Sequence, residues 1–295
     1  MDVEIKIQEP INRVTRKQKL KNYSKHPGSF LLALLTKLAI LLTVLALGFI
    51  LIYILVKGIP NLSTDLFALK YTTENVSMLP AIINTLIITL LSLCIAGPIG
   101  IFSAIYLVEY AKKGNKLVEV VRVTAETLTG IPSIVYGLFG MLFFVTTLKC
   151  GYSLLAGALT LSIMVLPVIM RTTEEALLAV PNSFREGSFG LGAGKLRTIF
   201  KIVLPSAVPG ILAGVILAIG RMVGETAALI YTAGTVAEIP SSIMSSGRTL
   251  AIHMYSLSKE GLYTNQAYAT AVVLLIVVVL INMLSNFVAK KFTKK

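Results

Sequence analysis

Charged residues, cysteines and histidines are scarce in this 295-residue sequence, and each shortage narrows the class of protein. Only 14% of the residues are charged and 55% are hydrophobic, whereas charged residues make up about one quarter of a soluble globular domain. The two cysteines, Cys94 and Cys150, lack a disulfide-framework or metal-ligand spacing, so we interpret them as packing residues. The two histidines, His26 and His253, are isolated and are predicted to lie at the surface. The composition therefore indicates an integral membrane protein without a metal site.

Catalytic motifs are missing as well. The patterns H-E-x-x-H and G-x-S-x-G do not occur, and no cluster of carboxylates suggests catalysis. Gly194-Lys195 is similar to the end of a phosphate-binding loop, but the pattern G-x4-G-K-[ST] would require glycine at Phe189 and serine or threonine at Leu196. We therefore expect no catalytic residue, no metal and no cofactor in this chain, and predict that it is not an enzyme.

Basic residues exceed acidic ones, and the formal net charge is +13. In a soluble protein this excess would suggest nucleic acid as a partner. Here the basic residues lie beside long apolar runs, where they orient a membrane protein against an anionic membrane face. We therefore expect membrane lipid around the chain and no nucleic acid.

Six apolar runs, each long enough to cross a bilayer, follow one another along the sequence. They predict an all-α fold with six transmembrane helices, at about residues 38–56, 82–110, 128–148, 154–170, 207–232 and 267–287. Pro98 is expected to bend the second helix. A polar and basic segment, residues 1–29, precedes the spans, and residues 30–36 are expected to form an amphipathic elbow at the membrane interface.

The distribution of lysine and arginine predicts the orientation. Six spans place both termini on one side of the membrane, and that side holds 21 of the 27 lysine and arginine residues, against five on the other side. Because basic residues favour the cytoplasmic side, we predict cytoplasmic N and C termini in a multi-pass protein of the cytoplasmic (inner) cell membrane. Residues 1–29 are then a cytoplasmic tail.

The segment 182–205 is polar and basic although it lies between two apolar runs. Ser183 and Glu186 have the S-x-x-E spacing of a capping box, which predicts a short helix from near Phe184. Three glycines within residues 190–194 are expected to end this helix in a turn, because glycine adopts left-handed backbone angles without steric cost. The amphipathic helix expected next has an apolar face formed by Leu196, Ile199, Phe200 and Val203. This arrangement predicts a rigid docking element for another protein.

This loop resembles the cytoplasmic signature of the permease subunits of ATP-binding-cassette (ABC) importers, E-A-A-x3-G-x9-I-x-L-P. Five residues match it at the family's spacing: Glu186, Gly192, Ile202, Leu204 and Pro205. Gly187 and Ser188 replace the two alanines, and both are small enough for close packing. The resemblance implies a type I ABC importer permease fold for residues 30–295, with residues 182–205 as the loop that couples it to separate ATPase subunits. ATP would be bound by those partner subunits.

Two opposite charges lie within the fifth predicted span, in the sequence GRMVGET at residues 220–226. Arg221 and Glu225 are four residues apart, so a continuous helix would place them on one face. Ionisable groups inside a membrane cost roughly 3 kcal/mol or more and are functional candidates, although an internal ion pair used only for packing is the alternative. The same helix contains two G-x-x-x-G pairs that permit close helix crossings, Gly210 with Gly214 and Gly220 with Gly224.

The third predicted span opens with the sequence TGIPSIVYG at residues 129–137. Pro132 frees a backbone carbonyl group, and Ser133 and Tyr136 lie three residues apart. Their hydroxyl groups either donate to an anion or compensate for the kink at the proline. The residues alone leave both alternatives open.

GIPSIVYG in the third span, GRMVGET in the fifth and AIYLVEYA at residues 104–111 together resemble the permeases of the high-affinity phosphate importer. Of the two permeases of that importer, the PstA-type subunit is the one that the basic tail and the compact periplasmic loops resemble more. The likeness runs from about residue 80 to the C-terminus. It implies ATP-driven import of inorganic phosphate. For such an anion, the charged and hydroxyl residues of the two motifs predict a substrate path along Arg221, Glu225, Thr226, Ser133 and Tyr136. The likeness also implies three kinds of partner: a second homologous permease subunit, two ABC ATPase subunits and an extracytoplasmic phosphate-binding protein.

Two other functions remain open. A permease for another oxyanion, such as molybdate or sulfate, would share the loop around Glu186 but is not expected to share both GIPSIVYG and GRMVGET. A stand-alone channel or secondary carrier belongs to a different class of transporter. Carriers often contain inverted repeats, and this sequence shows no convincing repeat. A docking loop would also have no purpose without an external ATPase.

Overall fold

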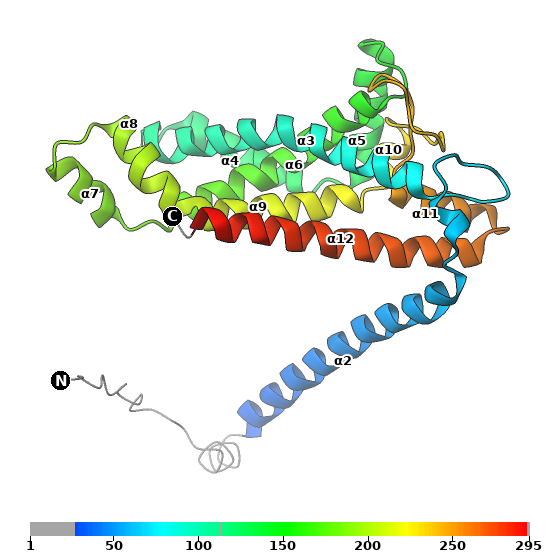
Figure 1. Cartoon of the computed structure of the whole chain (residues 1–295). Helices are drawn as coiled ribbons and strands as arrows, with labels where there is room; N and C mark the ends of the chain where they lie inside the picture. The colour runs from blue at the N-terminus through cyan, green and yellow to red at the C-terminus, as the bar shows by residue number, and fades with distance from the viewer. Residues whose placement is uncertain (1–26, 113, 294–295) are drawn as a thin grey trace, which may run out of the picture. The chain divides into compact units, whose positions relative to one another are not determined.

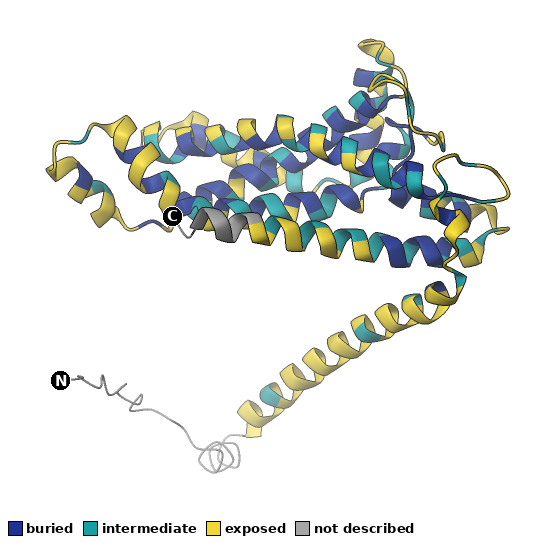
Figure 2. Cartoon of the chain, viewed as in Figure 1, coloured by how far each residue is buried: buried dark blue, intermediate teal, exposed yellow. Residues whose placement is uncertain are grey.

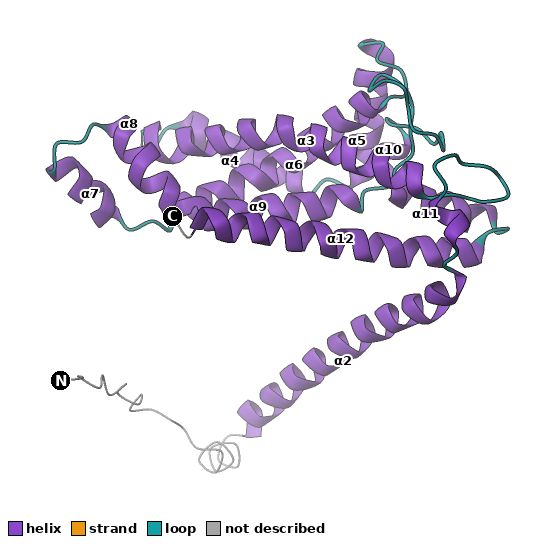
Figure 3. Ribbon diagram, viewed as in Figure 1, coloured by secondary structure: helices purple, strands orange, loops and turns teal. Residues whose placement is uncertain are grey.

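A computed structural model describes residues 27–112 and 114–293, with side chains as far as residue 287. The first 26 residues of the predicted tail lie outside this range. Over the described ranges the backbone forms helices, turns and loops but no strand, which confirms the all-α prediction (Figure 3). The chain divides into two compact units, residues 1–54 and residues 55–295.

Helix α2 (Pro27–Gly58) supplies the first candidate membrane span. It is continuous through residues 30–36, so the separate elbow expected there is not formed. Apolar residues occupy every side of this helix, which is about 48 Å long at 1.5 Å per residue. A helix that is apolar all round requires lipid or protein around it.

The second unit begins with two short 3-10 turns, η1 (Ile59–Asn61) and η2 (Thr64–Phe67). The elements that follow are α3 (Leu79–Ile105) with the π-helical extension Tyr106–Tyr110, α4 (Lys116–Thr129), α5 (Ser133–Gly140) with the π-helical extension Met141–Thr147, α6 (Leu154–Leu178), α7 (Asn182–Gly190), α8 (Lys195–Thr198), the π-helical segment Ile199–Val203, α9 (Leu204–Val223), α10 (Ala227–Ile230), α11 (Leu250–Glu260) and α12 (Thr264–Thr293). Helices α3, α6, α9 and α12 run side by side (Figure 1).

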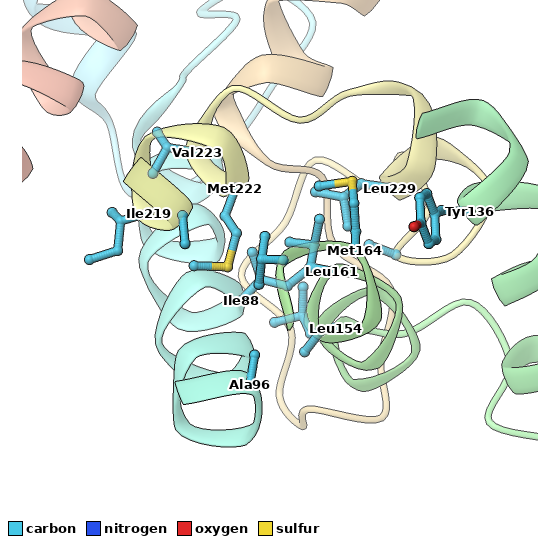
Figure 4. Packing of buried hydrophobic residues seen from close by; sticks show 14 of the residues in the cluster. Ile88, Ala96, Tyr136, Leu154, Leu161, Met164, Ile219, Met222, Val223 and Leu229 are labelled. Carbon is cyan, nitrogen blue, oxygen red and sulfur yellow. The ribbon is translucent and has the colours of Figure 1, made fainter. Parts of the chain in front are cut away.

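The core of this unit forms around α6. Leu161 and Met164 of α6 are buried in one cluster with Ile88 of α3, Met222 of α9 and Leu229 of α10 (Figure 4). The buried residues of these helices face one another, whereas exposed residues line their outer sides (Figure 2). The apolar core therefore holds the central helices together, and the outer faces of these helices also carry exposed apolar residues.

One of the two G-x-x-x-G pairs makes the predicted close helix crossing. A Cβ atom at Gly210 would lie 2.6 Å from the Cβ atom of Ala176, and one at Gly214 would collide with the hydroxyl group of Thr172. These two glycines let α9 approach α6 closely. The space beside Gly220 is open, so the second pair makes no such crossing within the described ranges.

Four predicted spans correspond to single apolar helices. Residues 38–56, 82–110, 154–170 and 267–287 fall within α2, α3 with its extension, α6 and α12. The fourth helix does not end near Arg171 but continues to Leu178.

The third predicted span, residues 128–148, is wrong as a single helix. Leu128 and Thr129 end α4, and α5 starts after residues 130–132, where the two helices are bent by 103°. Proline has no N–H group to donate and disfavours helical angles in the residue before it, so the helix stops ahead of Pro132. The α4–α5 pair is therefore a broken span or a re-entrant segment.

The fifth predicted span, residues 207–232, also differs from the structure. Helix α9 stops at Val223, residues 224–226 form a turn, and α10 is a separate short helix. The glycine at position 224 follows the helix end, where glycine is common. As a result Arg221 lies in the last turn of a helix and not at the middle of a continuous one.

Two isolated residues lie in environments other than those predicted. Cys94 is exposed on α3, so its predicted packing role is wrong within this chain. His253 has no exposed surface, so its predicted surface position is also wrong. His26 lies outside the described residues. The burial of a single residue depends on the face it occupies in the packed fold, which isolation in the sequence does not indicate.

Candidate functional site

The motifs of the third and fifth predicted spans lie against each other in the fold. Gly137 of α5 sits where a Cβ atom would lie 2.8 Å from the Cα atom of Ala228 and 3.1 Å from the carbonyl oxygen of Ala227 in α10. Only a residue without a side chain lets the two helices come this close. This contact brings the helix that carries Ser133 and Tyr136 beside the segment that follows α9.

Gly137→Ala is expected to destabilise the protein by about 1–3 kcal/mol, the usual range for overpacking a close contact. The atoms next to the new methyl group are backbone atoms, which cannot move aside as a flexible side chain can. The measurement is the thermal unfolding midpoint of the detergent-purified protein. Gly220→Ala is the matched control, because the space beside Gly220 is open. Equal midpoints for the two variants would contradict the close approach of α5 and α10.

Arg221 and Glu225 do not form an ion pair. Arg221 is partly exposed in the last turn of α9, whereas Glu225 lies beyond the helix end and is buried. The Oε1 atom of Glu225 accepts a 3.0 Å hydrogen bond from the backbone N–H of Ala228. None of the ion pairs among the described residues joins the two side chains. The prediction that they share one helix face is therefore wrong, because the helix ends between them.

Tyr136 compensates for the break between α4 and α5. Its hydroxyl group donates a 2.8 Å hydrogen bond to the carbonyl oxygen of Leu128, on the other side of the break. The ring is buried in the core (Figure 4). Ile219 and Met222, which flank Arg221 in α9, belong to the same buried cluster as Tyr136. The last turn of α9 therefore packs in the same core as the start of α5.

Two other predicted residues offer hydroxyl groups near the contact between α5 and α10. Ser133 is the first residue of α5, is partly exposed, and makes no side-chain hydrogen bond within the described part of the chain. Thr226 is the N-cap residue of α10, and its hydroxyl group makes only a long hydrogen bond of 3.5 Å to the carbonyl oxygen of Gly224. Both hydroxyl groups are available to a ligand.

The loop 182–205 forms a helix, a turn and a second helix, as predicted. Helix α7 begins at Asn182 with Pro181 as its N-cap and without a side-chain capping hydrogen bond. The predicted capping box is therefore wrong, because Ser183 already lies inside the helix. The turn that follows contains Gly192 with a φ of +81°, the left-handed conformation that glycine adopts without steric cost.

Ser188 joins α7 to the helix after the turn. Its Oγ atom lies 2.8 Å from the Oγ1 atom of Thr198 in α8, and both residues are buried. Glu186 and Gly187 are exposed. The signature residues of α7 therefore divide into one that fixes the loop and two that are available to a partner.

The second helix of the loop departs from the predicted apolar face. Ile199 and Val203 are buried, but Leu196 and Phe200 are exposed. The π-helical segment Ile199–Val203 has more residues per turn than an α-helix. This wider turn rotates the side chains out of the 3.6-residue register, and the helix then continues directly into α9.

A groove of about 530 Å³ lies between α7 and the helix after the turn. Phe184, Leu191 and Ile202 give it apolar walls, and Arg197 and Lys201 give it positive charge. Leu191 is 91% exposed, an unusual position for a large apolar side chain. The two remaining signature residues lie where the second helix joins α9: Leu204 and Pro205. The loop thus presents a shaped apolar and basic surface.

An ion pair joins this loop to the α3 extension. The sequence did not predict it. Arg185 of α7 donates hydrogen bonds of 3.1 and 2.7 Å to the Oε1 atom of Glu109. Their side chains are only 15% and 8% exposed. The same guanidinium group donates to the carbonyl oxygens of Val180 and Leu177, at 2.8 and 2.9 Å, near the end of α6. Movement of α7 would therefore be transmitted to two long helices.

Arg185→Gln is expected to lower the stability of the protein by about 1–3 kcal/mol, less than the roughly 3–5 kcal/mol for a fully buried pair, because this pair is partly exposed. The double variant Glu109→Gln with Arg185→Gln is expected to cost less than the sum of the single variants by at least about 1 kcal/mol. Thermal unfolding of the four proteins measures this difference. Strict additivity would show that the two side chains do not interact.

Comparison with known proteins identifies the family. The family model described as "Binding-protein-dependent transport system inner membrane component" matches residues 96–295, about two thirds of the chain. The chain belongs to this family. It is therefore a multi-span membrane protein of the ABC permease type.

Relatives of this permease align with it over most of its length. The phosphate transport system permease protein PstA of Pasteurella multocida is 36% identical over 269 residues, which cover 87% of this chain and 92% of the relative. The PstA protein of Haemophilus influenzae is 31% identical over 273 residues, with coverages of 91% and 96%. The probable ABC transporter permease protein YqgI of Bacillus subtilis is 32% identical over 261 residues, with coverages of 82% and 88%.

Solved structures of ABC transporters share the fold of the permease. A chain of a bacterial ABC transporter involved in the import of the acidic polysaccharide alginate has a TM-score of 0.66 at 16% identity, covering 92% of this chain and 99% of its own. A chain of the inward-facing MetNI methionine ABC transporter has a TM-score of 0.56 at 21% identity, with coverages of 73% and 94%. At these identities the likeness shows the fold alone, which is the type I ABC importer permease fold.

Proposed function

We propose that this chain is the permease subunit of an ATP-driven importer that carries inorganic phosphate across the cytoplasmic membrane. The observation that carries the proposal is the similarity, over 87% and 91% of this chain, to two proteins named as phosphate transport permeases. The contact of α5 with α10 supports it, because it joins the two motifs that resemble phosphate permeases. ATP is bound and hydrolysed by separate partner subunits.

The substrate path is proposed to pass Arg221. An anion that crosses a low-dielectric barrier needs a positive group, and the planar guanidinium group matches two phosphate oxygens. Ser133 and Thr226 offer hydroxyl groups to the remaining oxygens. Tyr136 and Glu225 are proposed to position α5 and α10 through their hydrogen bonds to the backbone. Because few groups contact the anion directly, its binding stays weak enough for release, as conduction requires.

Residues 182–205 are proposed as the coupling loop to which the ATPase subunits bind. The exposed Leu191, the groove beside it and the basic pair Arg197 and Lys201 form a surface suited to a protein partner. The ion pair between Arg185 and Glu109 would carry the movement into the membrane helices.

The complete importer is proposed to contain a second homologous permease subunit, two ABC ATPase subunits and an extracytoplasmic phosphate-binding protein. One solved structure of the alginate transporter contains a periplasmic protein with a bound alginate pentasaccharide, and the phosphate-binding protein would have the corresponding role. Within this chain, residues 1–29 are proposed as the cytoplasmic tail and residues 30–295 as the permease domain, in the inner membrane.

Labelling of single cysteines is expected to confirm the orientation that the charge distribution predicts. After both native cysteines are replaced, cysteines at Lys112 and Lys195 should react with an impermeant maleimide only in opened cells. Cysteines at Ser63 and Ser258 should react in intact cells. All four positions are exposed, so a lack of reaction reflects the membrane and not burial in the fold. Reaction of position 195 in intact cells would overturn the orientation.

Copurification of the tagged chain tests the proposed function. We expect a homologous permease and ABC ATPase subunits in the purified complex, and labelled-phosphate uptake only when ATP is supplied. Uptake of sulfate or molybdate in place of phosphate would favour the permease for another oxyanion. Transport by the chain alone without ATP would show a channel or a carrier.

A further inference from the structure

Buried polar atoms without partners are concentrated in one place in the permease. Among the described residues, eight buried side-chain oxygen or nitrogen atoms lack a hydrogen-bond partner, and six of them belong to Asn84, Arg248, Thr249 and His253. These four residues are neighbours: the Asn84 side chain donates to the carbonyl oxygen of Arg248 at 3.2 Å, and the backbone N–H of His253 donates to the carbonyl oxygen of Thr249 at 2.8 Å. Buried polar groups are rarely left unpaired, so this cluster requires an explanation.

Arg248 is a buried cation without an anion. The residue is 6% exposed, and its Nε and Nη2 atoms are buried without a partner. No ion pair involving Arg248 occurs within residues 27–112 and 114–293. Its guanidinium group lies 4.5 Å from the centre of the Tyr71 ring, an interaction of roughly 1–2 kcal/mol that is weaker than the cost of burying an unpaired charge. Arginine does not lose its proton in proteins, so the missing partner is an anion.

His253 adds a neutral donor to the same cluster. Burial lowers the pKa of His253 to about 3, and the positive charge of Arg248 acts in the same direction. The polar backbone of Val76 has a smaller effect that raises this pKa. The imidazole is therefore neutral at physiological pH, with one N–H donor and one acceptor nitrogen. Its ring is perpendicular to that of Tyr71, at a centroid distance of 6.3 Å. Arg248, His253 and the hydroxyl group of Thr249 thus present several donors and a positive charge, a set that suits an oxyanion.

One segment places an aromatic ring against the cluster. Residues 62–78, here called the strap segment, connect η1 to α3, and Tyr71 from this segment contacts both Arg248 and His253. Val76 in the same segment has a φ of +45°, a strained conformation for a β-branched residue. The hydroxyl group of Tyr263, just before α12, donates to the carbonyl oxygen of Thr73 at 2.9 Å. The strap segment therefore closes the cluster in this structure while storing backbone strain.

We propose that Arg248, Thr249 and His253 form an oxyanion-binding site that takes inorganic phosphate when the strap segment moves away. The inference rests on the proposed function, which supplies the substrate and places the strap segment on the extracytoplasmic side. Phosphate would meet this site before it reaches Arg221. A small anion fits the observations better than a partner's carboxylate, because the unpaired nitrogens are buried and a protein segment would have to displace more of the surrounding chain than a small ion would.

A fluorescent reporter tests this site directly. The chain contains no tryptophan, so Tyr71→Trp places a probe over Arg248 and keeps an aromatic face beside the cation. The complete importer complex is purified without the phosphate-binding protein, and the signal of the complex with Tyr71 is subtracted. Inorganic phosphate, sulfate and molybdate are titrated against chloride at equal ionic strength, without nucleotide and with ATP and vanadate.

We expect phosphate to change the reporter emission saturably in at least one of the two nucleotide conditions. Arg248→Gln should raise the half-saturating phosphate concentration by at least about tenfold, as the loss of a charged hydrogen-bond donor predicts. Lys259→Gln, which removes an exposed charge from the same helix, is the matched control and should leave the titration unchanged. If Arg248→Gln does not assemble, His253→Gln is used in its place and should raise the concentration in the same way.

Three results would separate this site from the proposed function. Labelled-phosphate uptake with no reporter response to any of the oxyanions would overturn the site and leave the function intact. A response to sulfate or molybdate but not to phosphate would overturn phosphate both as the ligand of this site and as the substrate. A phosphate titration that is the same with Arg248→Gln or His253→Gln as with the parent would overturn the site.

Discussion

Arg221→Gln is expected to reduce labelled-phosphate uptake to near background while the importer complex still assembles. Arg221 is partly exposed in the last turn of α9, and no carboxylate neutralises it within the described ranges. A hydrogen bond to a charged group contributes about 1.5–3 kcal/mol, so its loss predicts a ten- to hundredfold fall in transport. The helix dipole stabilises a cation at a helix C-terminus, which lowers the cost of placing the charge of Arg221 inside the membrane.

Two further variants sharpen this prediction. Arg221→Lys should be only partly active, since lysine keeps the charge but lacks the planar fork that binds two oxygens. Glu225→Gln should alter uptake less, because the amide oxygen can still accept the hydrogen bond from the backbone N–H of Ala228. Uptake is measured in membranes in which the subunit amounts have been compared. Normal uptake by an assembled Arg221→Gln complex would move the anion path to the partner permease or to Ser133.

Gly192→Val is expected to abolish phosphate uptake while the membrane helices insert normally and the ATPase subunits continue to hydrolyse ATP. Gly192 has a φ of +81°, a conformation that costs a β-branched residue about 1–2 kcal/mol or more. The chain would relieve this strain by changing the turn, which moves α7 relative to the helix after it. The groove to which the ATPase is proposed to bind would then have a different geometry.

Gly190→Ala is the matched control for this variant. Gly190 lies in the same loop, has open space beside it, and belongs to α7 without a positive φ. Its replacement by alanine should therefore preserve both uptake and its coupling to ATP hydrolysis. The measurement compares ATP hydrolysed with phosphate accumulated in reconstituted vesicles. A Gly192→Val complex with the parental ratio would show that the turn is not needed for coupling.

Much of the fold follows from the sequence, because apolar runs and turn residues act locally. Four of the six predicted spans correspond to single helices. In the other two, a helix ends inside an apolar run. The break at Pro132 separates α4 from α5, and the turn at residues 224–226 separates α9 from α10. Hydropathy reports whether a segment is apolar and does not report whether its helix is continuous.

The candidate site was predictable in part. The glycine turn at Gly192 and the close crossing at Gly210 and Gly214 were predicted, because both depend on residues a few positions apart. The pairing of Arg221 with Glu225 was wrong because it assumed an unbroken helix.

Contacts between distant parts of the chain were not predicted. Arg185 and Glu109 are 76 positions apart, and no local pattern links them. The one available signal was a lone carboxylate at the end of an apolar run, and it does not identify Arg185 as the partner of Glu109. The cluster around Arg248 and His253 depends on Tyr71, which is also distant in sequence.

Accumulation of labelled phosphate by the reconstituted importer is the most direct test of the proposal that this chain is a phosphate permease driven by separate ATPases. Vesicles contain this chain, its copurified permease and ATPase subunits, and the phosphate-binding protein. We predict accumulation that requires ATP, that unlabelled phosphate competes away, that equal concentrations of sulfate and molybdate leave unchanged, and that Gly192→Val abolishes. Accumulation without ATP, or competition by sulfate or molybdate as strong as that by phosphate, would contradict the account.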